Sequence, residues 1–234
     1  MAKQHILSID TAMSGCSASV HTEGGGSYTN SKPMSRGQAE HLVPMVQDVL
    51  AQAKAEFSDF ASIITTIGPG AFTGLRIGLS TAKSLGLALK IPVFGITTLQ
   101  ALALQYAPKN TKNLPIMVLI ETKRQDFYWQ TFNQQGETIS DASAGLANTI
   151  EEKIAGQPHL IIGDAVERFQ SLMQDGASEH ICETGFALPD TAFVARIFAE
   201  SKGEGSVFHS VPAPVYLRAP DVSKSKKKQR VIAS

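Results

Sequence analysis

The sequence predicts an α/β protein whose two halves share one architecture. Short β-branched runs alternate with segments whose apolar residues recur at three- and four-residue steps. The order of strands and helices in the first 106 residues also returns after Pro108. Because a strand–helix–strand order needs crossovers, each half is expected to hold a mixed or parallel sheet.

The first half is expected to begin with a β-hairpin of residues 5–9 and 16–20, closed by the three glycines 24–26. A helix follows from Ser35, with Pro44 predicting a kink. Its apolar residues fall on one face: Ala39, Leu42, Val43, Val46, Val49, Leu50 and Ala53. After it come a strand (62–67), a helix (73–89), a strand (92–96) and a helix (97–106).

The second half is expected to repeat this order. Its strands are residues 115–120, 127–132 and 159–163, and its helices are residues 150–155, 165–173 and 191–202. We therefore divide the chain into an N-terminal subdomain (1–108), a C-terminal subdomain (109–218) and a flexible tail (219–234).

The charge is unevenly distributed along the chain. Basic and acidic residues number 21 each, but five basic residues lie among the last eleven: Lys224, Lys226, Lys227, Lys228 and Arg230. The remaining body is therefore acidic and is by itself a poor binder of nucleic acid. A solubilising tail is the favoured interpretation, and a weak contact with nucleic acid is the alternative.

Other function classes are excluded by composition. Two distant cysteines, Cys16 and Cys182, allow neither a disulfide framework nor a cysteine zinc site. The N-terminal apolar stretch is too short for a signal peptide, and no apolar run is long enough to span a membrane. A cytoplasmic protein is expected.

A glycine-rich turn joins the strand 62–67 to the following helix. Gly68, Gly70 and Thr73 could bring backbone N–H groups to an anion at the helix N-terminus. A tight turn without a ligand is about equally favoured, because no Walker A lysine follows. Asp10, which ends the first strand, could contact a nucleotide site or merely cap the hairpin turn.

The helix after this turn carries small residues every four positions: Gly74, Gly78, Ala82 and Gly86. Glycine inside a helix costs about 0.5–1 kcal/mol relative to alanine, so close approach of another backbone is the usual reason for it. That backbone could belong to the same subdomain, which the sequence alone favours, or to another chain.

Several segments together resemble the bacterial TsaB (YeaZ) family. They are residues 6–11, residues 36–42, the glycine-rich block 68–78 with the stretch 92–102, and residues 214–218. The resemblance implies two ribonuclease-H-like subdomains of the actin and sugar-kinase superfamily. It also implies a non-catalytic subunit that the related protein TsaD requires to transfer a threonylcarbamoyl group to the adenosine next to the tRNA anticodon.

The resemblance implies partners as well. They are TsaD in a heterodimer, the ATPase TsaE, and tRNA only indirectly, with a homodimer when the chain is alone. The paired helices are expected to supply the interface, through Leu42, Val46, Gly74, Gly78, Leu79, Ala82 and Gly86. ATP and metal are expected on partner subunits, with no cofactor on this chain.

Two enzyme functions compete with this one. A metallopeptidase is excluded because Thr98 and Leu102 stand where TsaD carries its two metal-binding histidines, and the chain has no local histidine pair. A free-standing ATPase or kinase needs a complete nucleotide site, for which the chain offers only Asp10 and the Gly163–Asp164 pair. Family members with Asp-Ala-Arg differ from this chain, which reads Glu121-Thr122-Lys123-Arg124.

Overall fold

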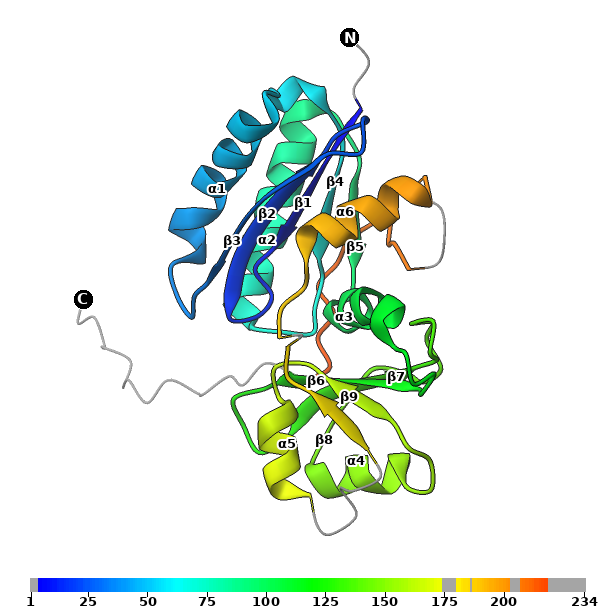
Figure 1. The fold of residues 1–234 in the computed structure, drawn as a ribbon. Coiled ribbons are helices and arrows are strands. Elements are labelled where there is room, and N and C mark those ends of the chain that lie inside the picture. Colours follow the sequence, from blue (N-terminus) through cyan, green and yellow to red (C-terminus); the bar gives the residue numbers. More distant parts are fainter. Residues whose placement is uncertain (1–3, 174–179, 186, 203–206, 219–234) are drawn as a thin grey trace, which may run out of the picture.

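The chain forms two five-stranded mixed sheets, each covered by helices (Figure 1). The structure, a computed structural model, describes residues 4–173, 180–185, 187–202 and 207–218. The predicted basic tail lies outside these residues. Among them, no helix is long and apolar enough to cross a membrane.

The two sheets have the same topology. The first has the order β3-β2-β1-β4-β5 and consists of β1 (His5–Asp10), β2 (Gly15–His21), β3 (Ser27–Pro33), β4 (Phe60–Thr66) and β5 (Val93–Ile96). The second has the order β8-β7-β6-β9-β10 and consists of β6 (Ile116–Glu121), β7 (Phe127–Phe132), β8 (Ser143–Gly145), β9 (Leu160–Ile162) and β10 (Ile181–Glu183). In both, the first three strands are antiparallel and the last two run parallel to the first. The predicted α/β class and the duplication are confirmed.

Helices cover both faces of each sheet. The helices α1 (Gln38–Ala53) and α2 (Phe72–Leu89) pack side by side on one face of the first sheet, and α6 (Thr191–Glu200) packs on the other (Figure 1). The helices α4 (Ala147–Ile154) and α5 (Val166–Leu172) cover the outer face of the second sheet, and α3 (Thr98–Tyr106) covers its inner face. Short 3₁₀ turns, η1 (Phe57–Asp59) and η2 (Ala107–Lys109), precede β4 and follow α3.

The third helix of each half packs on the sheet of the other half. Helix α3 follows the first sheet in the chain, yet its Leu99, Leu102 and Ala103 pack against the second sheet. Helix α6 comes late in the chain, yet Thr191 contacts the hydroxyls of Ser17 and Ser19 on β2. The division of the chain near residue 108 therefore separates the two sheets, but it does not separate all the helices that cover them.

Three strands, β3, β8 and β10, were not predicted from the sequence. Strand β3 is a polar edge strand, largely exposed, so it lacks the apolar alternation that marks a half-buried strand. Strands β8 and β10 have only three residues each. Within α1, Met45 takes a buried position, whereas Ala39 and Val43 are exposed. The helix continues through Pro44.

Candidate functional site

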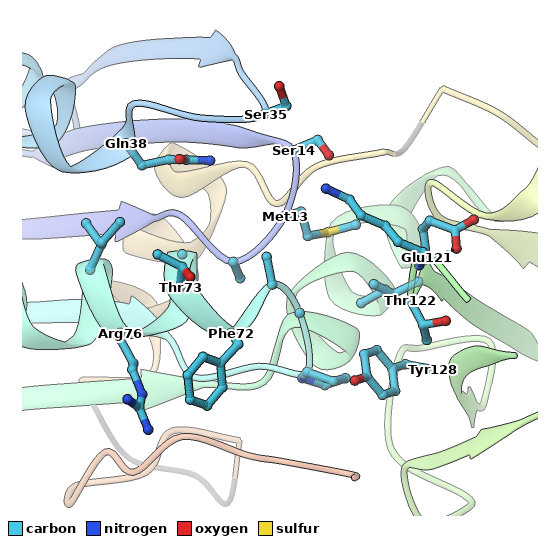
Figure 2. A pocket seen from close by; sticks show the side chains of 18 of the residues that line it. Met13, Ser14, Ser35, Gln38, Phe72, Thr73, Arg76, Glu121, Thr122 and Tyr128 are labelled. Atoms are coloured by element: carbon cyan, nitrogen blue, oxygen red, sulfur yellow. Dashed lines mark hydrogen bonds between the residues drawn. The ribbon is translucent and has the colours of Figure 1, made fainter. Parts of the chain in front are cut away.

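A cleft of about 900 Å³ opens between the two subdomains. Figure 2 shows side chains from both subdomains facing it: the turn after β1, the starts of α1 and α2, and the turn after β6. The C-terminal segment closes one side through Val215, Tyr216 and Arg218. Because ligands of α/β proteins gather where strands end, this cleft is the candidate site.

Asp10 ends β1 beside this cleft but does not line it. Its side chain is buried, and its Oδ1 accepts hydrogen bonds from the Thr66 hydroxyl at 2.5 Å and the Ala12 N–H at 3.1 Å. Burial raises the pKa of Asp10 to about 6, although both hydrogen bonds act in the opposite direction. In this position, Asp10 anchors the turn between β1 and β2.

The glycine-rich turn packs directly against that same β1–β2 turn. The Ala71 N–H donates to the Ala12 carbonyl at 2.7 Å. A Cβ at Gly70 would lie 2.2 Å from the Ala12 oxygen, and a Cβ at Gly74 would lie 2.0 Å from the Thr11 oxygen. Close backbone approach therefore explains these glycines. Of the predicted anion contacts, Gly70 and Thr73 line the cleft, whereas Asp10 and Gly68 do not.

The small-residue face of α2 faces inward. Ala82 is fully buried, a Cβ at Gly78 would meet the Thr11 hydroxyl at 2.6 Å, and a Cβ at Gly86 would meet Val93 at 2.3 Å. The remaining residues of the predicted interface, Leu42, Val46 and Leu79, are buried as well. In the single chain, the first sheet and its turns therefore cover all seven residues that were expected to supply the partner interface.

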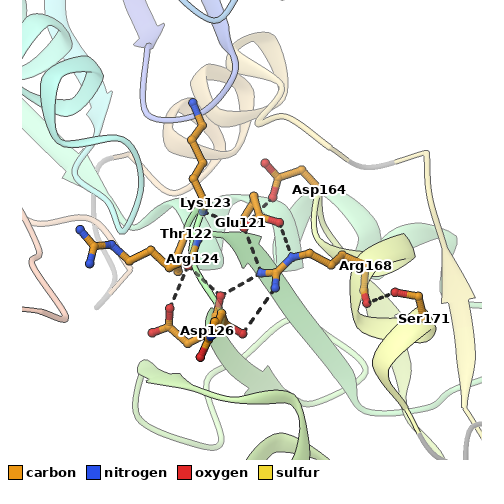
Figure 3. A network of polar contacts seen from close by, with 9 residues as sticks. Glu121, Thr122, Lys123, Arg124, Asp126, Asp164, Arg168 and Ser171 are labelled. Carbon is orange, nitrogen blue, oxygen red and sulfur yellow. Dashed lines mark hydrogen bonds and ion pairs between the residues drawn. The ribbon is translucent and has the colours of Figure 1, made fainter.

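A polar network organises the second half of the cleft (Figure 3). Glu121 ends β6 at the position that Asp10 occupies in the first sheet. The Arg168 guanidinium donates to both of its oxygens, at 2.7 and 2.9 Å, and the Lys123 N–H donates to Oε1 at 2.7 Å. The Glu121 N–H donates to Asp164 at 2.8 Å, and burial raises the pKa of Asp164 to about 6.

Arg168 was missed by the sequence analysis, although a signal was present. It lies in the first turn of α5, where the helix dipole disfavours a cation. The structure shows that its partner is Glu121, 47 positions earlier in the chain.

The described residues do not offer a metal centre. No group of three or more His, Cys, Asp or Glu side chains comes together among them. Thr98 and Leu102 are buried in α3. His159 and His180 do approach, with ring centroids 5.9 Å apart, but the His180 ring accepts a hydrogen bond from the His159 N–H.

An exposed aromatic pair lies at the rim of the cleft. The Phe72 and Tyr216 rings are 5.4 Å apart, and the Arg76 guanidinium lies 3.9 Å from the Phe72 centroid. The segment that carries Tyr216 is held at both subdomains. The Val215 N–H donates to Ile67 at 2.7 Å, and Arg218 forms an ion pair with Asp126.

Comparisons with known proteins agree with this architecture. The family model described as "TsaD: tRNA N6-adenosine threonylcarbamoyltransferase" matches residues 18–198. The tRNA threonylcarbamoyladenosine biosynthesis protein TsaB of Buchnera aphidicola subsp. Schizaphis graminum is 32% identical over 171 residues, which cover 70% of this chain and 80% of that protein. The TsaB protein of Escherichia coli K12 is 30% identical over 134 residues, 57% of each chain.

A solved structure extends the likeness to the whole fold. YeaZ from Pseudomonas aeruginosa superposes with a TM-score of 0.75 at 25% identity, covering 92% of this chain and all of that one. Its fold and the duplicated sheets confirm the two ribonuclease-H-like subdomains expected from the sequence. The chain therefore belongs to the TsaB (YeaZ) family of tRNA threonylcarbamoyladenosine biosynthesis proteins.

Proposed function

We propose that this chain is the non-catalytic subunit that TsaD requires to transfer a threonylcarbamoyl group to the adenosine next to the tRNA anticodon. The observation that carries the proposal is the state of the acidic groups at the cleft. Asp10, Glu121 and Asp164 each accept hydrogen bonds from protein groups, and Glu121 is also ion-paired with Arg168. Asp10 does not line the cleft and both oxygens of Glu121 bind Arg168, so neither carboxylate is placed to bind the magnesium ion of a nucleotide.

A second observation, on the glycine-rich turn, disfavours the alternative of a free-standing ATPase or kinase. The glycine-rich turn presents its Ala71 N–H to the Ala12 carbonyl rather than to the cleft. We therefore propose that ATP and metal belong to partner subunits and that the pure chain turns over no ATP. The proposed role in tRNA modification also implies a cytoplasmic location.

The exposed sides of α1 and α2 are the proposed surface for TsaD and, in its absence, for a second copy of this chain. The two helices lie together on one face of the first sheet, where no other described element covers them (Figure 1). Val43 on α1 is 43% exposed, and Ser80 on α2 is exposed. A two-fold dimer uses one patch against itself, so the same patch also fits a structurally similar partner. TsaE is the further proposed partner.

Co-purification with TsaD tests this proposal. We expect Val43→Glu combined with Ser80→Glu to abolish pairing, because both charges enter the proposed interface while the fold has no need of either side chain. Ile139→Glu, on an exposed residue of the second subdomain, is the control and should pair normally. Circular dichroism checks folding, and light scattering after size exclusion reports the homodimer.

Two outcomes would overturn the proposal. One is a folded Val43→Glu/Ser80→Glu variant that pairs with TsaD at wild-type affinity. The other is ATP turnover by the pure chain that depends on Asp10, which would favour the enzyme alternative.

A further inference from the structure

The mouth of the cleft concentrates positive charge on a protein body that is otherwise acidic. Arg36, Arg76, Lys123 and Arg124 line it, and all four are exposed. They come from three places in the fold: the entry to α1, the first turns of α2, and the turn between β6 and β7. Lys123 and Arg124 extend away from the polar network of the second half (Figure 3).

Among the residues that line the cleft, five are basic and three are acidic. Glu121 is already paired with Arg168, and Asp164 accepts a hydrogen bond from the Glu121 N–H. Glu40 is the remaining acidic residue among those that line the cleft.

In contrast to the expectation that tRNA is an indirect partner only, we infer that the mouth of the cleft itself binds the phosphate backbone of RNA. Clustered Lys and Arg supply most of the affinity of proteins for nucleic acid. The exposed Phe72–Tyr216 pair adds ring surface on which an unpaired base can stack, with Arg76 beside it. The choice of tRNA as the RNA rests on the proposed function.

The geometry favours a backbone along the rim over a small nucleotide deep in the cleft. A nucleotide phosphate would need the N–H groups of the glycine-rich turn. The Ala71 N–H of that turn binds the Ala12 carbonyl, and Gly70 and Gly74 lie against the carbonyls of Ala12 and Thr11. The basic side chains, in contrast, stand at the exposed rim.

Fluorescence anisotropy of a labelled tRNA transcript with the full chain tests the inference over a series of KCl concentrations. We expect Arg36→Gln/Lys123→Gln/Arg124→Gln to lower the affinity at least tenfold at 0.1 M salt. Because each phosphate contact contributes about −0.7 to −0.9 to the slope of log K against log salt, the slope should become shallower by roughly 2 to 3. The matched control Lys54→Gln/Lys83→Gln/Lys153→Gln removes the same charge from exposed residues outside the cleft and should change affinity less than threefold.

A second variant separates stacking from charge. Phe72→Leu keeps an apolar side chain but removes the ring, so affinity should fall severalfold with an unchanged salt slope. The inference is overturned if wild-type protein does not bind at low salt, or if the control triple variant loses as much affinity as the cleft variant. It is also overturned if ATP displaces the tRNA competitively, or if deleting residues 219–234 alone abolishes binding. Co-purification of the cleft triple variant with TsaD reports the proposed function independently.

Discussion

The two halves of this chain have one topology, but they surround the acidic residue at the end of their first strand with different groups. In the first half, the acid at the end of the leading strand is Asp10, fully enclosed and held by neutral groups. In the second half it is Glu121, partly exposed and held by the Arg168 cation. Strand order therefore fixes where an acidic side chain stands, but the groups around it decide whether it is a buried anchor or half of an ion pair.

The helices of the two halves also differ, in length and in packing. The helices α1 and α2 have 16 and 18 residues, whereas their counterparts α4 and α5 have 8 and 7. Small residues on α2 let the sheet and its turns approach closely, whereas α5 packs the large Phe169 into the core on the second sheet. The first half thus gains a long exposed helical surface, and the second half keeps only what covers its sheet.

The largest expected effect tests whether the small-residue face of α2 is internal. Ala82→Glu would bury an unpaired charge against the first sheet, so we expect a loss of about 4 kcal/mol in the free energy of unfolding. Ser84→Glu, two positions along the same helix but exposed, should change it by less than about 0.5 kcal/mol. Urea unfolding followed by circular dichroism measures both. A stable Ala82→Glu variant that loses only its pairing would show instead that the small-residue face of α2 contacts a partner.

The next largest effect concerns how the stability contributed by the buried Asp10 depends on pH. The pKa of Asp10 is raised from 3.8 to about 6, so its contribution to stability is complete below pH 4 and is lost as the pH rises through 6. The loss corresponds to about 3 kcal/mol, at 1.36 kcal/mol per pKa unit. We expect Asp10→Asn to remove it, so that the variant gains stability relative to wild type between pH 4 and pH 7.

Asp164 provides the counterpart in the second half. Its pKa is raised in the same direction, so Asp164→Asn should flatten the pH profile with the same sign. Urea unfolding at pH 4, 5, 6 and 7 measures both variants. An Asp10→Asn profile parallel to that of wild type would show that Asp10 is not a buried anchor.

The smallest effect separates a structural ion pair from a surface pair. Arg168→Gln removes a two-pronged contact to Glu121 and a bond to the Asp126 carbonyl, and should cost about 2 kcal/mol. The matched control is Arg196→Gln, whose partner Glu200 lies one helical turn away with both side chains largely exposed, and it should cost about 0.4 kcal/mol. Equal losses in thermal unfolding experiments would contradict the assigned role of Arg168.

Local signals in the sequence were sufficient for most elements and for the family. Apolar periodicity located α2 to within one residue, and β7 matches its predicted bounds. Periodicity did not find β3, because an exposed edge strand has no apolar face to display. Periodicity also placed Val43 rather than Met45 on the buried face of α1, because both lie near the boundary of that face and either spacing fits a helix.

The sequence by itself determined the α/β class, the duplicated order of elements, the glycine-rich turn and the family to which they belong. Only the tertiary structure decided which side of each helix is free. A stripe of small residues indicates that another backbone approaches the helix. The contact of Gly74 with the Thr11 carbonyl shows that this backbone is the chain's own β1–β2 turn. The pairing of Glu121 with Arg168, the meeting of His159 with His180 and the exchange of α3 and α6 between the sheets were decided in the same way. Each joins residues far apart in the chain, and helical or strand periodicity carries information only about neighbours within a few residues.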